Sequence, residues 1–367
     1  MRRRTGLMAA LVQSTGVDLV LVCGEQRAGG GVGWLTGWPV TAEAIALFDP
    51  ARTPVLFIQH YNHVPLAGRI AAQCEVRWGG TSTIDTLHAE LSKRSSKKIG
   101  LIGPMSAAKL RRLGERFELV DCNAAYAELR LVKSAEELDW VRIAAWLSDL
   151  AIDALRREAR SGIDERELWR ICENAYAAQG GTTWIHYFGV TSMAEPDRCV
   201  PAQYPSARRV RKGDVMFCEI SAQFWDYPGQ VLRSFSIETD PTALYRDLYA
   251  VADEAFKCIL KAIRKGAPAS ALVEASSVIE KAGFTTCDDL VHGFVGGYLP
   301  PVLGSASRPA GPLPERLLEA GMTIVVQPNV VTRDGRAGVQ VGELVLVTES
   351  GCETLHQAPM GFLRLGG

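Results

Sequence analysis

The chain has 367 residues, a length that corresponds to about two domains. Its 40 Lys and Arg residues nearly cancel its 41 Asp and Glu residues, which argues against a nucleic-acid or membrane-surface partner. No apolar run reaches the roughly 18 residues that span a bilayer, so no membrane segment is expected. The nine cysteines, without a C-x-x-C spacing, predict free thiols in a reducing cytoplasm, and six histidines argue against a histidine-rich metal site.

Residues 7–125 alternate short apolar runs with helical patterns. The apolar runs predict strands at 19–23, 44–48, 54–58 and 98–102. Strands that alternate with helices indicate an α/β domain with a mixed or parallel sheet. The glycines at 29–33 lack both G-x-G-x-x-G and the lysine-serine pair of a Walker loop, so we predict a flexible loop there and no phosphate cradle.

A long helix begins the second part of the chain. Ser134 followed by Glu137 forms a capping box before apolar positions that recur every three to four residues, which predicts a helix at about 135–160. Further helices are predicted at about 164–179, 242–265 and 269–283, and strands at 214–223, 229–238, 322–334 and 339–348. The first two of these strands, separated by residues 225–229, predict a β-hairpin. Helices grouped with antiparallel strands indicate an α+β domain.

Several short motifs occur in an order that resembles a known superfamily. They are Gly33-Trp-Leu-Thr-Gly37, Leu129-Arg-Leu-Val-Lys-Ser-Ala-Glu-Glu137, Gly213-Asp-Val-Met-Phe-Cys-Glu-Ile-Ser-Ala222, Leu232-Arg-Ser-Phe235, His292-Gly-Phe-Val-Gly296, Gly321-Met-Thr-Ile-Val-Val-Gln-Pro328 and Gly338-Val-Gln-Val-Gly-Glu-Leu-Val-Leu-Val-Thr348. With them the chain resembles the creatinase/aminopeptidase P/methionine aminopeptidase superfamily, which has the pita-bread fold. The resemblance implies a creatinase-like α/β N-terminal domain at 1–128 and an α+β pita-bread catalytic domain at 129–367. It also implies a homodimer in which Arg27 and the 29–33 loop reach the neighbouring pocket.

The superfamily's metal positions carry different residues in this chain. In its metallopeptidases, two Asp, one His and two Glu hold two divalent ions and the water that they activate. The matching positions are Glu219, Gln230, His292, Gln327 and Gly342. Glu219, with at most a second negative charge from Glu343, cannot offset the four positive charges of two such ions, and an amide oxygen neutralises nothing. We therefore predict no metal and no cofactor.

Polar residues replace these ligands, which indicates a rebuilt site rather than a decayed one. Decay would more often leave apolar residues, because each buried unpaired polar group costs ~1–3 kcal/mol. His292 is the predicted proton-transfer residue, with Glu219 to orient it or to raise its pKa. The residues predicted to hold the substrate's polar groups are Gln230, Gln327 and Gln340.

For several of these residues a structural role competes with the functional one. A structural His292 would hold the glycine-rich loop, and a structural Glu219 would form a salt bridge with Arg233 across the hairpin. Arg233 is either such a partner or a substrate clamp. His186, among aromatic residues, is either a third catalytic residue at the pocket edge or a core histidine. Two further substrate-binding candidates are Glu343 and Tyr298.

Two adjacent carboxylates, Asp288 and Asp289, precede His292. Paired carboxylates are typical of acid–base sites. The run Thr286-Cys-Asp-Asp289 is also typical of a turn or helix cap, and we predict that structural role here.

Three functions are compatible with these residues. The leading hypothesis is a metal-independent hydrolase of a C–N bond in a small amide- or amidine-type substrate. Creatinase is a metal-free hydrolase of the same superfamily, but its catalytic histidine falls at Ala202 or Gln203 here and its glutamate at Leu232. The alternative is a metal-dependent Xaa-Pro dipeptidase or aminopeptidase. The third is a non-hydrolytic lyase or a binding protein without catalysis.

Overall fold

The computed structural model describes residues 2–26, 30–295 and 297–366, and the chain divides into two compact units, Met1–Arg130 and Leu131–Gly367. This division falls after Arg130, whereas the predicted boundary follows residue 128. All nine cysteines lie in the described ranges and are free thiols. Among the described residues, no helix is both long and apolar enough to cross a bilayer.

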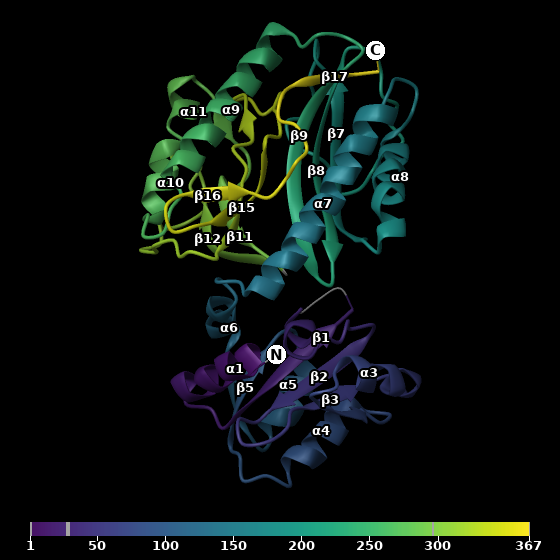
Figure 1. The fold of residues 1–367 in the computed structure, drawn as a ribbon, viewed down its shortest axis with the longest axis vertical. Helices are drawn as coiled ribbons and strands as arrows, with labels where there is room; N and C mark the ends of the chain where they lie inside the picture. The colour runs from purple at the N-terminus through teal and green to yellow at the C-terminus, as the bar shows by residue number, and fades with distance from the viewer. Residues whose placement is uncertain (1, 27–29, 296, 367) are drawn as a thin grey trace. The chain divides into compact units, whose positions relative to one another are not determined.

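The first unit is a mixed sheet covered by helices (Figure 1). Its strand order is β4-β3-β2-β1-β5-β6, with antiparallel pairs around β2 and parallel pairs elsewhere. The strands are β1 (Leu19–Glu25), β2 (Glu43–Phe48), β3 (Val55–Ile58), β4 (Glu75–Trp78), β5 (Lys98–Ile102) and β6 (Glu118–Asp121). The helices are α1 (Arg2–Thr15), α2 (Gly31–Thr36), α3 (Val64–Ile70), α4 (Thr83–Leu91), α5 (Ala107–Gly114) and α6 (Asn123–Leu129). Of the two predicted forms of the α/β sheet, mixed or parallel, the mixed form is observed.

The glycine-rich segment is a helix over part of its length, so the prediction of a loop is wrong there. Gly31 begins α2, and residues 27–29, which include Arg27 and Gly29, lie outside the described residues. A Cβ added to Gly31 would lie 2.9 Å from Cγ1 of Val22. Glycine therefore lets the start of α2 approach β1 closely, a packing requirement that no phosphate-binding motif reveals.

The second unit is a long, mainly antiparallel sheet with helices packed on it. Its strand order is β12-β11-β13-β15-β9-β8-β7, with β16 beside β15 and β17 beside β9. The strands are β7 (Thr182–Ser192), β8 (Asp214–Phe224), β9 (Tyr227–Ile237), β10 (Thr285–Thr286), β11 (Val291–Phe294), β12 (Tyr298–Leu303), β13 (Thr323–Val326), β14 (Val330–Val331), β15 (Gly342–Val347), β16 (Cys352–Thr354) and β17 (Leu363–Leu365). The helices are α7 (Ala135–Glu158), α8 (Glu165–Tyr176), α9 (Ala243–Ala262), α10 (Ala269–Ala275) and α11 (Val278–Lys281).

Local signals in the sequence explain most of these elements. The capping box is present, with Ser134 Oγ accepting from the Glu137 N–H and the Glu137 side chain accepting from the Ser134 N–H. The helix predicted at 269–283 is two short helices, α10 and α11, with Ser276 and Ser277 between them. The strand predicted at 322–334 is also divided, because Pro328 lacks the N–H that a ladder needs.

The hairpin of β8 and β9 closes through Trp225 and Asp226 alone. Both residues have positive φ, +48° and +64°. Such values are typical of a two-residue hairpin turn whose backbone twist matches that of the flanking strands. The register that follows places Ser221 opposite Gln230 and Cys218 opposite Arg233. Because side chains alternate between faces, this turn decides which polar residues share a face of the sheet.

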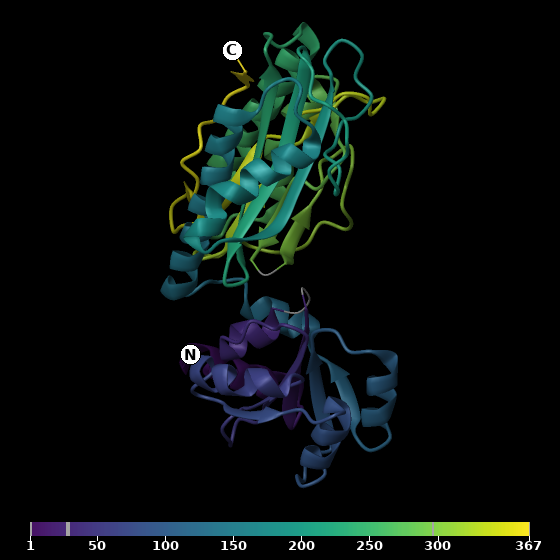
Figure 2. The same ribbon diagram turned by 90° about the vertical axis from the view of Figure 1, so that its right-hand side faces the viewer.

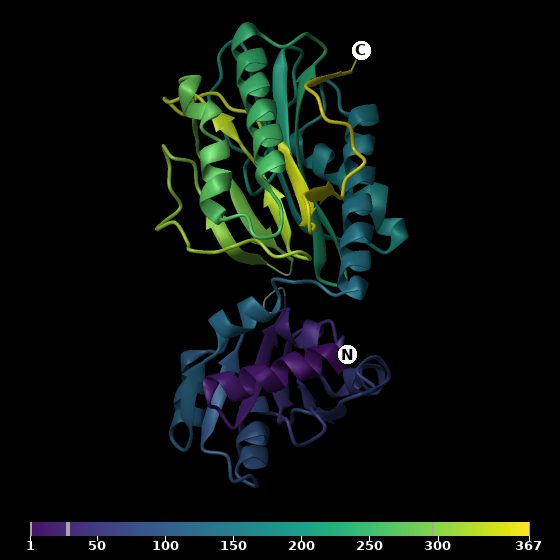
Figure 3. The ribbon, with the colours of Figure 1, turned by 60° about the vertical axis from the view of Figure 1, so that its left-hand side comes forward.

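Helices α7 and α8 cover one face of β7, β8 and β9 (Figures 1 and 2). Met216, Cys218, Ile220 and Val231 pack there in one core cluster with Leu147 and other residues of the two helices. Figure 3 shows α9, which runs along the half of the unit that holds β13 and β14. We call the face of β7 to β9 under α7 and α8 the helix face, and the opposite face the site face.

Candidate functional site

Glu219 and Gln230 lie on the site face. Alternation from Cys218 and Ile220, which pack under α7 and α8, turns Glu219 to the other side of the sheet. Gln230 is opposite Ser221 and therefore shares the face of Glu219. The two side chains are hydrogen bonded, with Gln230 Nε2 donating to Glu219 Oε1 at 2.7 Å.

The strand register carries the same face across the sheet to His292. Gly342 is opposite Leu232, which is itself opposite Glu219. Two residues further along β15, Leu344 is opposite Val325, and Val325 is opposite His292. Each directly opposed pair points to one side, so His292 and Glu219 face the same way although they are 73 positions apart in the chain (292 − 219).

Amide groups link the residues of this face. The Nε2 group of Gln230 donates a second hydrogen bond to Gln327 Oε1 at 3.1 Å, and Gln327 Nε2 donates to the backbone oxygen of Asp289 at 3.2 Å. Gln230 and Gln327 are each 1% exposed. The predicted substrate-binding pair is thus part of a fixed network that positions Glu219.

Glu219 and His292 have opposite pKa shifts. Burial, together with the nearby charges of Asp288 and Asp289, raises the pKa of Glu219 to about 8, so its carboxyl group is protonated at neutral pH. Burial lowers the pKa of His292 to about 4, so its ring is neutral. Glu219 therefore does not raise the pKa of His292, and that prediction is wrong because desolvation dominates.

The tautomer of His292 follows from its surroundings. Nδ1 lies 3.1 Å from the backbone oxygen of Gly293, an acceptor, so Nδ1 carries the proton in the neutral ring. Nε2 then has a lone pair, and it has no hydrogen-bond partner among the described residues. A buried, unprotonated imidazole nitrogen of this kind can take a proton from water.

Asp288 and Asp289, predicted as a turn or cap, belong to the site. Asp289 Oδ2 lies 4.0 Å from His292 Nε2, and Tyr298 donates to Asp289 Oδ1 at 3.3 Å. Burial and the neighbouring Asp289 raise the pKa of Asp288 to about 7. No helix follows for them to cap, because the next element is β11. Their position just before the strand of His292 was the signal that could have identified them.

Tyr298 stacks on His292, and the backbone of Gln340 is bonded to a residue of the site face. The Tyr298 ring stacks on His292 with centroids 4.0 Å apart, and it remains 57% exposed. Gln340 is fully buried, and its backbone N–H donates to Ser234, which shares the site face with Phe217 and Glu219. In the described part of the chain, neither polar atom of the Gln340 side chain has a hydrogen-bond partner.

Arg233 and Glu343 are not at the site, so their prediction as substrate-binding residues is wrong. Arg233 is opposite Cys218 and points to the helix face. It forms a buried ion pair with Glu343 at 2.7 Å and donates to backbone oxygens of Gly342, Ala358 and Pro359. The predicted alternative, a pair between Arg233 and Glu219, is also absent because the two residues are on opposite faces.

The placement of His186 at the pocket edge is wrong as well. His186 is opposite Ile220 on the helix face and is fully buried against Trp169 and Tyr176 of α8. Tyr176 Oη is 2.7 Å from Nε2, and the backbone oxygen of Ile185 is 2.5 Å from Nδ1. Both ring nitrogens are satisfied, which is the core role that we considered as the alternative.

The site does not fit the two divalent ions that the fold implies. Gln230 Nε2 lies between Glu219 and Gln327, so an amide donor stands among the side chains that would have to coordinate metal. At Gly342, a Cβ would lie 2.3 Å from the backbone oxygen of Val326, which leaves no room for a side chain that could bind a cation. Among the described residues, no three His, Cys, Asp or Glu side chains are grouped to hold a metal.

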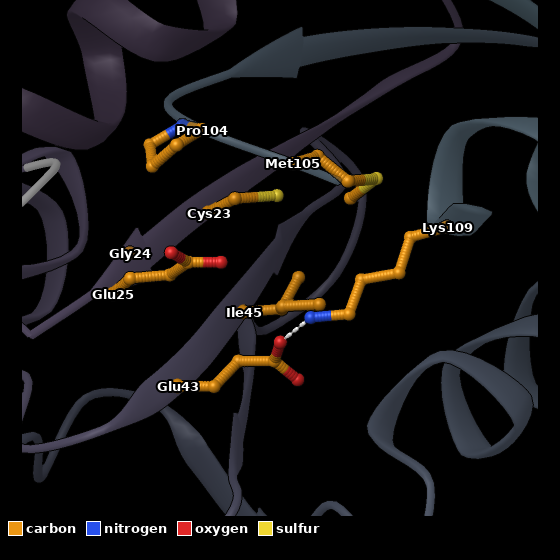
Figure 4. A pocket seen from close by; sticks show the side chains of 8 residues that line it. All are labelled: Cys23, Gly24, Glu25, Glu43, Ile45, Pro104, Met105 and Lys109. Carbon is orange, nitrogen blue, oxygen red and sulfur yellow. Dashed lines mark ion pairs between the residues drawn. The ribbon is translucent and has the colours of Figure 1, made fainter. Parts of the chain in front are cut away.

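A small pocket in the first unit is a different feature (Figure 4). Cys23, Glu25 and Ile45 line it, together with an ion pair between Glu43 and Lys109. Burial raises the pKa of Cys23 to about 12, so its thiol is not a reactive thiolate at neutral pH. The candidate site is therefore the site face of the second unit.

Comparison with known proteins decides the family. Residues 139–349 match the model of metallopeptidase family M24. The chain belongs to metallopeptidase family M24, a family of hydrolases that act on C–N bonds. Both the predicted superfamily and the predicted pita-bread fold are confirmed.

Individual proteins resemble this chain at low identity. An uncharacterized peptidase of Staphylococcus haemolyticus is 26% identical over 250 residues, 64% of this chain and 65% of that protein. A Xaa-Pro dipeptidase of Pyrococcus furiosus is 24% identical over 268 residues, 71% of this chain and 74% of that protein. The crystal structure of an X-Pro aminopeptidase from Thermotoga maritima superposes with a TM-score of 0.85 at 20% identity and covers 98% of this chain and 99% of its own.

Proposed function

We propose that this M24 protein hydrolyses the C–N bond of a small peptide- or amide-type substrate without a divalent metal. The observation that carries the proposal is the Gln230 amide, which is hydrogen bonded to both Glu219 and Gln327 at the positions of family metal ligands. The chemistry must then come from the side chains themselves. Protonated Glu219 and neutral His292, on one face, are a general acid and a general base in their working forms at neutral pH.

The reaction needs only these two groups and water. His292 Nε2 takes one proton from water as the water oxygen adds to the substrate carbonyl carbon. The C–N bond then breaks with its electron pair on nitrogen, and Glu219 gives its proton to that nitrogen. The products are an amine and a carboxylic acid, and the proton held by His292 returns to Glu219 through the solvent. Asp289, close to His292 Nε2, favours the transient imidazolium.

A peptide substrate has more support than an amidine. Relatives and structural neighbours are named Xaa-Pro dipeptidases or aminopeptidases, and these likenesses favour the peptide-bond alternative over a creatinase-like substrate. A metal-dependent Xaa-Pro dipeptidase is accordingly the second candidate function. The two candidates share a substrate class and differ in whether turnover requires a cation.

Metal content and turnover, measured on the same preparation, distinguish these candidates. The full chain is purified without chelator, its Mn, Co and Zn are quantified, and hydrolysis of proline-containing dipeptides and small amides is followed with chelator and with added Mn²⁺. We expect turnover that neither treatment changes. Two ions per chain with turnover abolished by chelator would establish the second candidate. Tight calorimetric binding of these compounds without turnover, unchanged in His292→Ala, would indicate a binding protein.

A homodimer and a cytoplasmic location remain predictions. Sedimentation of the purified chain tests the first of them. We expect a dimer, and a species of only about 40 kDa, near the 39.9 kDa of one chain, would contradict it.

A further inference from the structure

Two cysteines close to the candidate site have their thiol groups side by side. Cys199 Sγ and Cys287 Sγ are 3.9 Å apart, although the residues are 88 positions apart in the chain. Cys199 follows β7, in the segment where the family histidine position falls at Ala202 or Gln203. Cys287 immediately precedes Asp288 and Asp289. A covalent bond between these thiols would therefore join two segments that border the site.

The surrounding backbone holds both cysteines in place. On one side, the Ala202 N–H donates to the Phe188 oxygen at 2.8 Å, and a Cβ on Gly338 would lie 2.4 Å from the Cys199 oxygen. On the other side, β10, which ends at Thr286, pairs with β14. The short distance between the sulfurs thus follows from packed strands on both sides.

The two thiols differ in exposure, and this difference determines which of them an external disulfide reagent meets first. Cys287 is half-buried, and Arg308 Nη1 donates to its sulfur at 3.7 Å. Cys199 is 7% exposed, and burial with the adjacent thiol raises its pKa to about 11. An external reagent therefore reaches Cys287 first.

We propose that Cys199 and Cys287 form a reversible disulfide with an oxidant of the glutathione-disulfide class, and that this bond fastens the segment after β7 to the segment before β11. The Cys287 thiolate attacks the reagent, forms a mixed disulfide and releases one thiolate. Cys199 then attacks the Cys287 sulfur and releases the second. Two protein thiols lose two electrons and two protons, and the reagent becomes two thiols.

The bond is tested on the folded full chain without any substitution. The protein is equilibrated in glutathione redox buffer, the remaining thiols are alkylated, and unreduced peptides are mapped by mass spectrometry. We expect a peptide pair joined through Cys199 and Cys287, reversed by dithiothreitol. If glutathione accumulated on Cys287 while Cys199 stayed a free thiol that the reagent alkylates, the proposal would be overturned. Equal yield of the joined peptides from urea-unfolded chain would also overturn it, because the fold would then contribute nothing.

Variants and hydrogen exchange measure what the bond does. Cys287→Ser should abolish the joined peptides, whereas Cys258→Ser and Cys352→Ser, at other partly exposed cysteines, should leave their yield unchanged. Amide exchange in residues 193–203 should slow by about tenfold on oxidation, because a crosslink suppresses local opening. Unchanged exchange would refute the fastening role even where the disulfide forms.

Regulation of hydrolysis by this bond rests on the proposed function. Cys287 adjoins Asp288, whose charge acts on Glu219, so oxidation should change turnover in the wild type and not in Cys287→Ser. The peptide map and the exchange rates need no substrate. If the disulfide forms but the protein hydrolyses nothing, the proposed function is contradicted and the disulfide proposal stands.

Discussion

The two faces of the second unit's sheet carry similar residues in different states. On the helix face, the His186 ring and the Arg233 guanidinium are buried with hydrogen-bond or ion-pair partners. On the site face, His292 Nε2 and the Gln340 amide are equally buried and, within the described ranges, lack such partners. The two histidines are thus of the same type and equally buried, so neither property distinguishes the faces. What distinguishes a candidate reactive group is an unpaired polar atom, which costs free energy unless a ligand satisfies it.

The largest expected effect contrasts the two buried histidines. His292→Gln should lower kcat/KM by between about 10² and 10⁴, because a general base is lost. His186→Gln should instead lower the free energy of unfolding by roughly 1–3 kcal/mol, because the contacts with Tyr176 and Ile185 are lost. Kinetics and urea unfolding of both variants make the comparison. Equal loss of turnover per folded molecule would remove the distinction between the faces.

The next effect concerns the ion pair of the helix face. Arg233→Met leaves Glu343 buried and unpaired, so the free energy of unfolding should fall by about 3–5 kcal/mol. The control is Arg142→Met, whose ion pair with Glu353 is exposed on both sides, so its loss should cost at most about 1 kcal/mol. Urea denaturation measures both. If Arg233→Met were as stable as the wild type but inactive, Arg233 would belong to the site after all.

A smaller effect appears in the pH dependence of stability. The pKa of Glu219 is raised from 4.5 to about 8, so between these pH values the folded state retains a proton that the unfolded state loses. Stability should therefore fall over that range, with Glu219 still contributing between pH 7 and 8. One proton corresponds to at most about 1.4 kcal/mol per pH unit. The raised pKa of Asp288 acts in the same direction only up to about pH 7. The lowered pKa values of His186 and His292 act below about 6.5, where they make stability rise with pH.

Glu219→Gln isolates this proton. The variant should lack the fall in stability between pH 7 and 8, as measured by urea denaturation at each pH. Glu238→Gln is the matched control, because Ser161 lowers the pKa of that carboxylate and its contribution is lost only under acidic conditions. A slope that persists in Glu219→Gln would show that another group holds the proton.

The smallest effect is expected at Gln340. Gln340→Met removes two unpaired amide atoms at nearly constant volume, so stability should change by no more than about 1 kcal/mol while KM rises. Asn329→Leu is the contrast, since Asn329 Oδ1 accepts from the Val341 N–H and its loss should cost about 1–3 kcal/mol. An unchanged KM in Gln340→Met would exclude Gln340 from substrate binding.

The sequence predicted the family and the absence of family metal ligands because both depend on residue identity at ordered motif positions. It also predicted that Glu219, Gln230, His292 and Gln327 belong together, through those same motifs. Asp288 and Asp289 were assigned to a turn or cap because no motif includes them. Only the folded chain places them beside His292.

The errors at His186, Arg233 and Glu343 share one physical reason. The sequence shows that side chains alternate along a strand, but the pairing register decides which face of the sheet each side chain occupies. Here the two-residue turn at Trp225 and Asp226 places Arg233 opposite Cys218. The pairing of β9 with β15 then places Glu343 within ion-pair distance of Arg233. The sequence by itself therefore determined which residues the chain offers for chemistry, and the tertiary structure decided which of them are left without partners.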